Sequence, residues 1–190
     1  MEKFKEFSEF TAHSRNISAL ISMYRLIENT DVASIELTPI IVFQAFSIES
    51  FLNHLGGKHI DIWDHIERLS WRKKVEVLHT HAEKKTDWGS KELQFAAKIF
   101  KIRDRLAHGK PEFVEGSREY TSQAELEAEC NRKPMLEPKW YKEITRESIL
   151  SSKNDFIYLI EYFSSLMGEH KSTYLNTGSG GFITISTKEA

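Results

Sequence analysis

Residues 91–111 read KELQFAAKIFKIRDRLAHGKP, and this stretch decides the fold that the sequence predicts. At about 100° per residue, its apolar side chains gather on one broad arc of a helix. They are Leu93, Phe95, Ala96, Ala97, Ile99, Phe100, Ile102, Leu106 and Ala107. His108 is followed by Gly109 and then Pro111, which are the usual signals of a helix C-terminus. The stretch therefore predicts an amphipathic helix that ends on a histidine.

Arg103 is the exception on this helix, because it projects from near the middle of the apolar arc. An unpaired guanidinium in a protein core is very costly, so Arg103 must reach an acid, a cleft or a second subunit. Three other cations, Lys98, Lys101 and Arg105, fall together on the opposite side.

A second predicted helix, residues 39–55, reads PIIVFQAFSIESFLNHL and is apolar almost all the way round. Such a helix belongs at the centre of a bundle. Thr38 is its expected N-cap, and Gly56 with Gly57 is its expected end. Glu49 lies among apolar neighbours on this helix, which is as unusual a position for an acidic residue as that of Arg103 is for a basic one. We expect the two to form an ion pair, because pairing lowers the cost of burying both charges.

The remaining periodicities complete an all-α fold, a bundle of about five main helices in a single domain over residues 1–168. The other helices are expected at residues 6–28, 70–82 and 146–167, with a short turn of helix at 62–69. Residues 110–145 hold three of the four prolines and form a long loop excursion before the last helix, with a short helix at residues 123–130. Residues 169–190 form a flexible glycine-containing tail, whose alternating segment is either disordered or adds to a partner as a strand.

The composition narrows the class of protein. No apolar run approaches the ~20 residues of a membrane span, and the N-terminus MEKFKEFSEF lacks signal-peptide features. A single cysteine, Cys130, excludes an internal disulfide and fits a reducing compartment, so we expect a cytoplasmic protein. The net charge of −2 argues against a general affinity for nucleic acid, so any such contact requires a local basic patch.

The sequence RDRLAH at 103–108, followed by Gly109, resembles the signature of the HEPN superfamily of helical bundle domains. Members carry an arginine, usually a polar residue after it, and a histidine five to seven positions after the arginine. Asp104 meets the polar position, and the preceding core helix with Glu49 also looks like that of many members. The resemblance covers about residues 39–109 and the closing helix. It leaves the excursion and the tail unexplained.

The resemblance implies a metal-independent endoribonuclease without cofactors, active as a homodimer whose Arg and His pairs meet across the interface. It assigns His108 as general acid or base, Arg103 as the phosphate contact and Asp104 as the group that orients one of them, with Glu49 in support. These residue types suit RNA cleavage, because histidine titrates near neutral pH and guanidinium stays charged beside phosphate. Beside such a cleft, Lys98, Lys101 and Arg105 would bind the RNA. Toxin or phage-defence components of this kind have RNA as substrate or ligand and an antitoxin or other partner protein.

Two other interpretations remain open at this point. One is a non-catalytic HEPN module that dimerises and binds a nucleotide, an RNA or a partner protein. The other is a helical protein whose Glu49–Arg103 pair and helix-ending His108 are purely structural. The spacing puts His108 about 140° around the helix from Arg103, so the two meet only if the helix unwinds at Gly109 or a dimer mate supplies one of them.

Other chemistry-bearing side chains have simpler interpretations. His79 and His81 are two residues apart and diverge on a helix. A zinc site is not expected either at His54, His59 and His65, which lack a cysteine or carboxylate framework of known spacing. The tryptophans are interpreted as core or loop anchors rather than base-stacking platforms; they are Trp63, Trp71, Trp88 and Trp140. Lys98, Lys101 and Arg105 also fit an ordinary solvated face.

Overall fold

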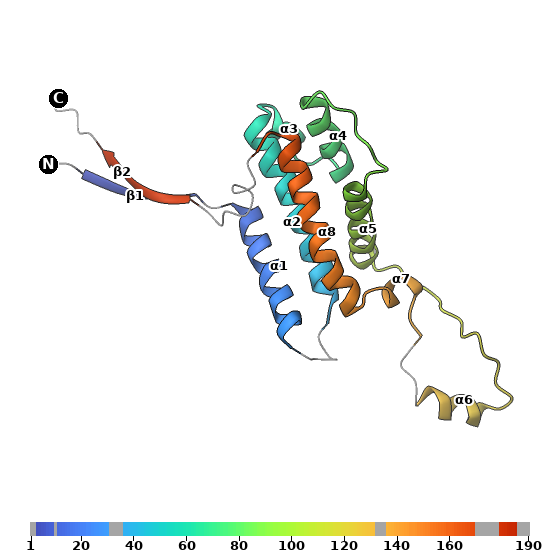
Figure 1. Ribbon diagram of the computed structural model, residues 1–190. Coiled ribbons are helices and arrows are strands. Elements are labelled where there is room, and N and C mark those ends of the chain that lie inside the picture. The colour runs from blue at the N-terminus through green and yellow to red at the C-terminus, as the bar shows by residue number, and fades with distance from the viewer. Residues whose placement is uncertain (1–2, 10, 31–35, 132–135, 170–178, 186–190) are drawn as a thin grey trace.

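A computed structural model of the protein describes residues 3–9, 11–30, 36–131, 136–169 and 179–185. Over these residues it is an all-α bundle, as predicted, with five helices of eleven residues or more (Figure 1). Three further helices are short. The helices are α1 (Ala12–Asn29), α2 (Thr38–His59), α3 (Trp63–Ile66), α4 (Trp71–His81), α5 (Lys91–His108), α6 (Gln123–Cys130), α7 (Lys139–Lys142) and α8 (Arg146–Leu166). Over the residues described, none of them is both long and apolar enough to cross a membrane.

Helix α2 lies at the centre of the bundle, because it contacts each of α1, α4, α5 and α8. Ala45, Ile48 and Leu52 on α2 are completely buried. The helix is not covered all the way round, however, since the side chain of Phe46 is 46% exposed. The predicted central position is therefore confirmed, with one side of α2 left open to solvent.

The predicted end of α2 at Gly56 and Gly57 is wrong, because the helix continues to His59. A Cβ added at Gly56 would lie 2.1 Å from carbon atoms of the Trp63 ring. Gly56 is thus present for close packing of α3 on α2 and not to stop the helix. The predicted N-cap is displaced as well, since Leu37 is the N-cap and Thr38 is already helical.

Helix α5 has the predicted bounds, Lys91–His108. The Ser90 side chain caps its N-terminus by accepting a hydrogen bond from the backbone N–H of Leu93 at 3.3 Å. Gly109 ends the helix with φ +49°, a left-handed conformation that suits glycine, and its N–H donates to the carbonyl of Arg105. Helix α5 packs against α2 and α8, and its buried side chains belong to the hydrophobic core. Local signals are sufficient to define this helix.

The two ends of the chain form an antiparallel ribbon of β1 (Lys3–Glu9) and β2 (Ser179–Ile185), with Lys3 opposite Ile185 and Glu9 opposite Ser179. In Figure 1 this ribbon leads away from the bundle. The prediction of a first helix from residue 6 is therefore wrong up to Glu9, because backbone pairing with a distant segment prevails over local periodicity. The predicted flexible tail contains β2, which pairs with this chain's own N-terminal strand. Residues 170–178 and 186–190 of that tail lie outside the described residues.

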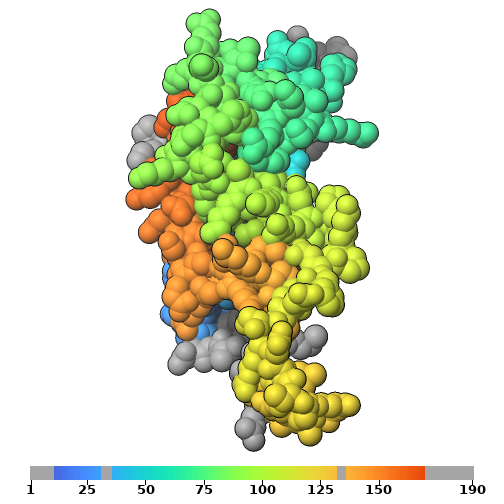
Figure 2. All heavy atoms as spheres, turned by 90° about the vertical axis from the view of Figure 1, so that its right-hand side faces the viewer, coloured from blue at the N-terminus to red at the C-terminus, as the bar shows by residue number. Residues whose placement is uncertain are grey.

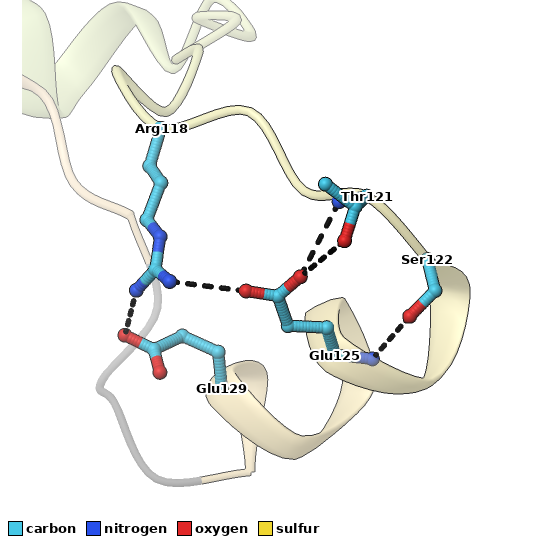
Figure 3. A network of polar contacts seen from close by, with 5 residues as sticks. All are labelled: Arg118, Thr121, Ser122, Glu125 and Glu129. Atoms are coloured by element: carbon cyan, nitrogen blue, oxygen red, sulfur yellow. Dashed lines mark hydrogen bonds and ion pairs between the residues drawn. The ribbon is translucent and has the colours of Figure 1, made fainter.

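The excursion between α5 and α8 extends away from the bundle and carries α6, at the bounds predicted (Figures 1 and 2). Arg118 holds the loop to α6 through Glu125 at 3.0 Å and Glu129 at 3.7 Å (Figure 3). The hydroxyl and the backbone N–H of Thr121 both donate to Glu125 and hold the pKa of that carboxyl below its ordinary value. The Ser122 hydroxyl caps α6 by accepting from the N–H of Glu125. No residue of α6 is buried.

The excursion returns to the bundle beside α5. The guanidinium of Arg105 lies 5.4 Å from the ring centre of Trp140 on α7, and the indole N–H of Trp140 donates to Glu112 at 2.9 Å. These contacts attach both ends of the excursion next to the C-terminus of α5.

Candidate functional site

Glu49 of α2 has two basic partners, one from α4 and one from α5. The Lys74 ammonium donates to its Oε1 at 3.1 Å, and Nη2 of Arg103 lies 3.9 Å from its Oε2. The predicted Glu49–Arg103 pair is therefore confirmed, but at the longer of the two distances. Glu49 is shared between the cations, and Lys74 holds it more closely.

Lys74 is not among the site residues that the sequence predicts. Its side chain is only 2% exposed, whereas that of Glu49 is 36% exposed. Trp71, Lys74, Val75 and Leu78 follow helical spacing, which places Lys74 on the buried side of α4. A buried ammonium needs an acid, so the reasoning that found Arg103 applies equally to Lys74.

The guanidinium of Arg103 is only partly neutralised. Its side chain is 27% exposed, and its guanidinium carbon lies 5.2 Å from the ring centre of Phe100. Asp104 Oδ1 lies 3.4 Å from the Arg103 Nε, but Nε makes no hydrogen bond, so this contact is electrostatic. The two acids thus approach Nη2 and Nε, while the side chain stays partly exposed. Arg103 is anchored by acids and still accessible to solvent.

His108 stands apart from this cluster. It is the last residue of α5 and is exposed, and α5 stays helical up to it. A five-residue step on a helix separates two residues by about 7.5 Å along the axis and 140° around it. Helix unwinding therefore does not bring His108 to Arg103. Within one chain, the fold gathers Glu49, Arg103 and Asp104 of the predicted site and leaves His108 separate.

The predicted RNA-binding residues Lys98, Lys101 and Arg105 are all exposed. Over the described residues, none of them lies within ion-pair distance of a carboxylate. Lys98 lines a cavity of about 520 Å³ between α5 and α8, which also has walls from Phe95, Ile99 and Asp155. The residues of the motif do not line this cavity, so it and the Arg103 cluster are separate features.

Two histidines outside the motif, His59 and His79, have polar partners elsewhere in the fold. His59 lies 2.7 Å from Glu169, and buried His79 donates from Nδ1 to the carbonyl of Val75 while its Nε2 lies 2.6 Å from the Tyr162 hydroxyl. In the part of the chain that the structure describes, no group of three or more His, Cys, Asp or Glu side chains is arranged to hold a metal ion.

Comparison of the chain with models of known protein families, with curated proteins and with solved structures found no match.

Proposed function

We propose that the protein is a HEPN-type, metal-independent endoribonuclease that acts as a homodimer, as a toxin or phage-defence component. The observation that carries the proposal is the environment of Arg103. Its side chain is 27% exposed, and its Nη2 lies 3.9 Å from Oε2 of Glu49. It also lies on the same helix as exposed His108. A guanidinium with one edge held by acids and another edge free can both keep its position and bind phosphate.

The chemistry needs a base, an acid and a fixed cation. A base takes the proton from the RNA 2′-hydroxyl, the 2′-oxygen attacks phosphorus, and the bond from phosphorus to the 5′-oxygen breaks as that oxygen gains a proton. His108 serves as base or acid because imidazole titrates near neutral pH. Arg103 binds the phosphate as negative charge builds on it, while Asp104, 3.4 Å away, orients the guanidinium. The required 2′-hydroxyl restricts the reaction to RNA.

A second copy of the chain is needed to complete this site. His108 is remote from the Arg103 cluster of its own chain, so the His of one copy would serve beside the Arg of the other across a two-fold axis. The open side of α2 supports this arrangement. Exposed Phe46 lies one helical turn before Glu49, so an apolar side chain accompanies the charged cluster on the same side. The same proposal expects a cytoplasmic protein with an antitoxin or other partner protein.

The test compares the wild type with His108→Ala and Arg103→Lys, in growing cells and as purified proteins incubated with single-stranded RNA and a chelator. The wild type is expected to arrest growth and to cleave RNA despite the chelator, and both variants to lose at least about 100-fold in rate. His81→Ala is the matched control, because His81 is also exposed and is the last residue of its helix. It is expected to cleave normally.

Three outcomes would count against the proposal. RNA binding without cleavage by the wild type would favour the non-catalytic module. Equal cleavage by wild type and His108→Ala would attribute the activity to another protein. A monomer by sedimentation at working concentration would leave the paired site unbuilt.

A further inference from the structure

A row of side chains connects α4 to the Arg103 cluster. The rings of Trp71 and Phe100 are stacked nearly parallel, 4.6 Å between centroids and 7° between planes. The guanidinium of Arg72 lies 5.1 Å from the Trp71 ring, and that of Arg103 lies 5.2 Å from the Phe100 ring. Two arginines are thus joined through a pair of stacked rings, one from each helix.

Trp88 adds a second aromatic surface at the Arg72 end. Its ring meets Trp71 edge-on at 5.7 Å, and the guanidinium of Arg72 lies 4.7 Å from its centre. Arg72 is exposed, and both tryptophans are half-buried. Over the residues described, no carboxylate lies within ion-pair distance of Arg72. The two indole rings contact the faces of the guanidinium, which leaves its hydrogen-bonding edge available to an anion.

We propose that Arg72, Trp71 and Trp88, here called the Arg72 platform, bind single-stranded RNA leading to Arg103. This inference rests on the proposed function, whose substrate contacts it extends. Unpaired bases stack on aromatic rings and on guanidinium planes, while arginine also bonds to phosphate. A base stacks at Arg72 and Trp88, and the adjoining phosphate takes the free edge of Arg72. Duplex RNA hides its base faces and cannot use the platform in this way.

The spacing sets the length of RNA that the platform engages. The three centre-to-centre distances, laid end to end, bound the separation of the two guanidinium carbons at about 15 Å. A stacked strand rises about 3.4 Å per nucleotide, so at most about four nucleotides span the two guanidinium groups. A strand with its scissile phosphate at Arg103 therefore reaches Arg72 within about four nucleotides to one side. Shorter oligonucleotides bind without the platform.

The experiment measures binding of fluorescent single-stranded RNA of two lengths, three and twelve nucleotides, to His108→Ala protein, so that cleavage does not interfere. Arg72→Gln in this background is expected to weaken binding of the longer RNA at least about fivefold and to leave the shorter RNA unaffected. The salt dependence of log Kd is expected to fall by about 0.7. Arg25→Gln is the matched control, because exposed Arg25 on α1 carries the same charge. It is expected to change binding less than twofold.

Trp88→Leu gives a second measurement, with the melting temperature confirming the fold. This substitution is expected to weaken binding of the longer RNA and to reduce the quenching of tryptophan fluorescence that binding causes. Equal affinities of the Arg72→Gln and Arg25→Gln proteins would overturn the platform, as would an equal loss for duplex RNA. The proposed ribonuclease activity would still stand in that case if cleavage depends on His108. Conversely, RNA binding that depends on Arg72, in a wild type that does not cleave RNA, would contradict the ribonuclease proposal and support the platform.

Discussion

The ammonium of Lys74 lies 3.1 Å from Oε1 of Glu49, and it is the more deeply buried member of that pair. This asymmetry leaves Arg103 as the second and more distant partner of the carboxylate, at 3.9 Å. Lys74 thus takes the structural role that the sequence gives to Arg103, and Arg103 keeps freedom to bind a ligand.

Removing the two partners is expected to have unequal costs. Glu49→Gln leaves the buried Lys74 ammonium without its counter-charge and should destabilise the protein by about 2–3 kcal/mol. Lys74→Met should cost about 1 kcal/mol or less, because Glu49 is partly solvated and retains Arg103. Urea unfolding measures both, with Lys73→Met as the control, since the Lys73–Glu76 pair is exposed. Equal losses for the two variants would contradict this account.

The paired glycines of α2 should respond in opposite directions to alanine. Gly56→Ala is expected to cost about 1–3 kcal/mol, because its Cβ would meet the Trp63 ring at 2.1 Å. Gly57→Ala should stabilise the helix by about 0.5–1 kcal/mol, since nothing lies within 4 Å of its Cβ and alanine favours helix. Thermal unfolding of the two variants measures the difference. A stabilising Gly56→Ala would mean that α3 does not pack on α2 as described.

The open side of α2 should control association of two chains. Phe46→Glu is expected to shift a dimer to monomer in analytical ultracentrifugation and to abolish RNA cleavage while the helical content is retained. Leu26→Glu changes another exposed apolar residue, on α1, and should leave the dimer intact. A Phe46→Glu protein that remains dimeric would place the interface elsewhere.

Glu169 should stabilise the protein only above acidic pH. A hydrogen bond from Lys58, together with the contact to His59, holds the pKa of Glu169 below its ordinary value of 4.5. The stabilisation is present above pH 4.5 and is lost as the pH falls through the lowered pKa of the folded state. Glu169→Gln should therefore lower the free energy of unfolding at pH 7 by less than about 1 kcal/mol, with a small decrease in melting temperature. The difference in melting temperature between wild type and Glu169→Gln should disappear towards pH 2. A difference that does not change with pH would contradict the ion pair of Glu169 with Lys58.

The agreement between sequence and structure is closest where the determinants are local. The bounds of α5 follow from its apolar arc, the Ser90 cap and Gly109, all of which act within a few residues of the helix. The same holds for α6 and its Ser122 cap. The Glu49–Arg103 pair was also within reach, because two misplaced charges of opposite sign need each other.

Tertiary structure alone decided the features that depend on distant partners. The sequence by itself determined that the chain forms a helical bundle with a charged position in its central helix, because periodicity and burial cost are local properties. It did not determine that Lys74 would take the nearer oxygen of Glu49, that Trp63 would require Gly56, or that Lys3–Glu9 would pair with Ser179–Ile185. Each depends on which surfaces contact one another when the chain folds, and the residues adjacent in sequence do not specify those contacts.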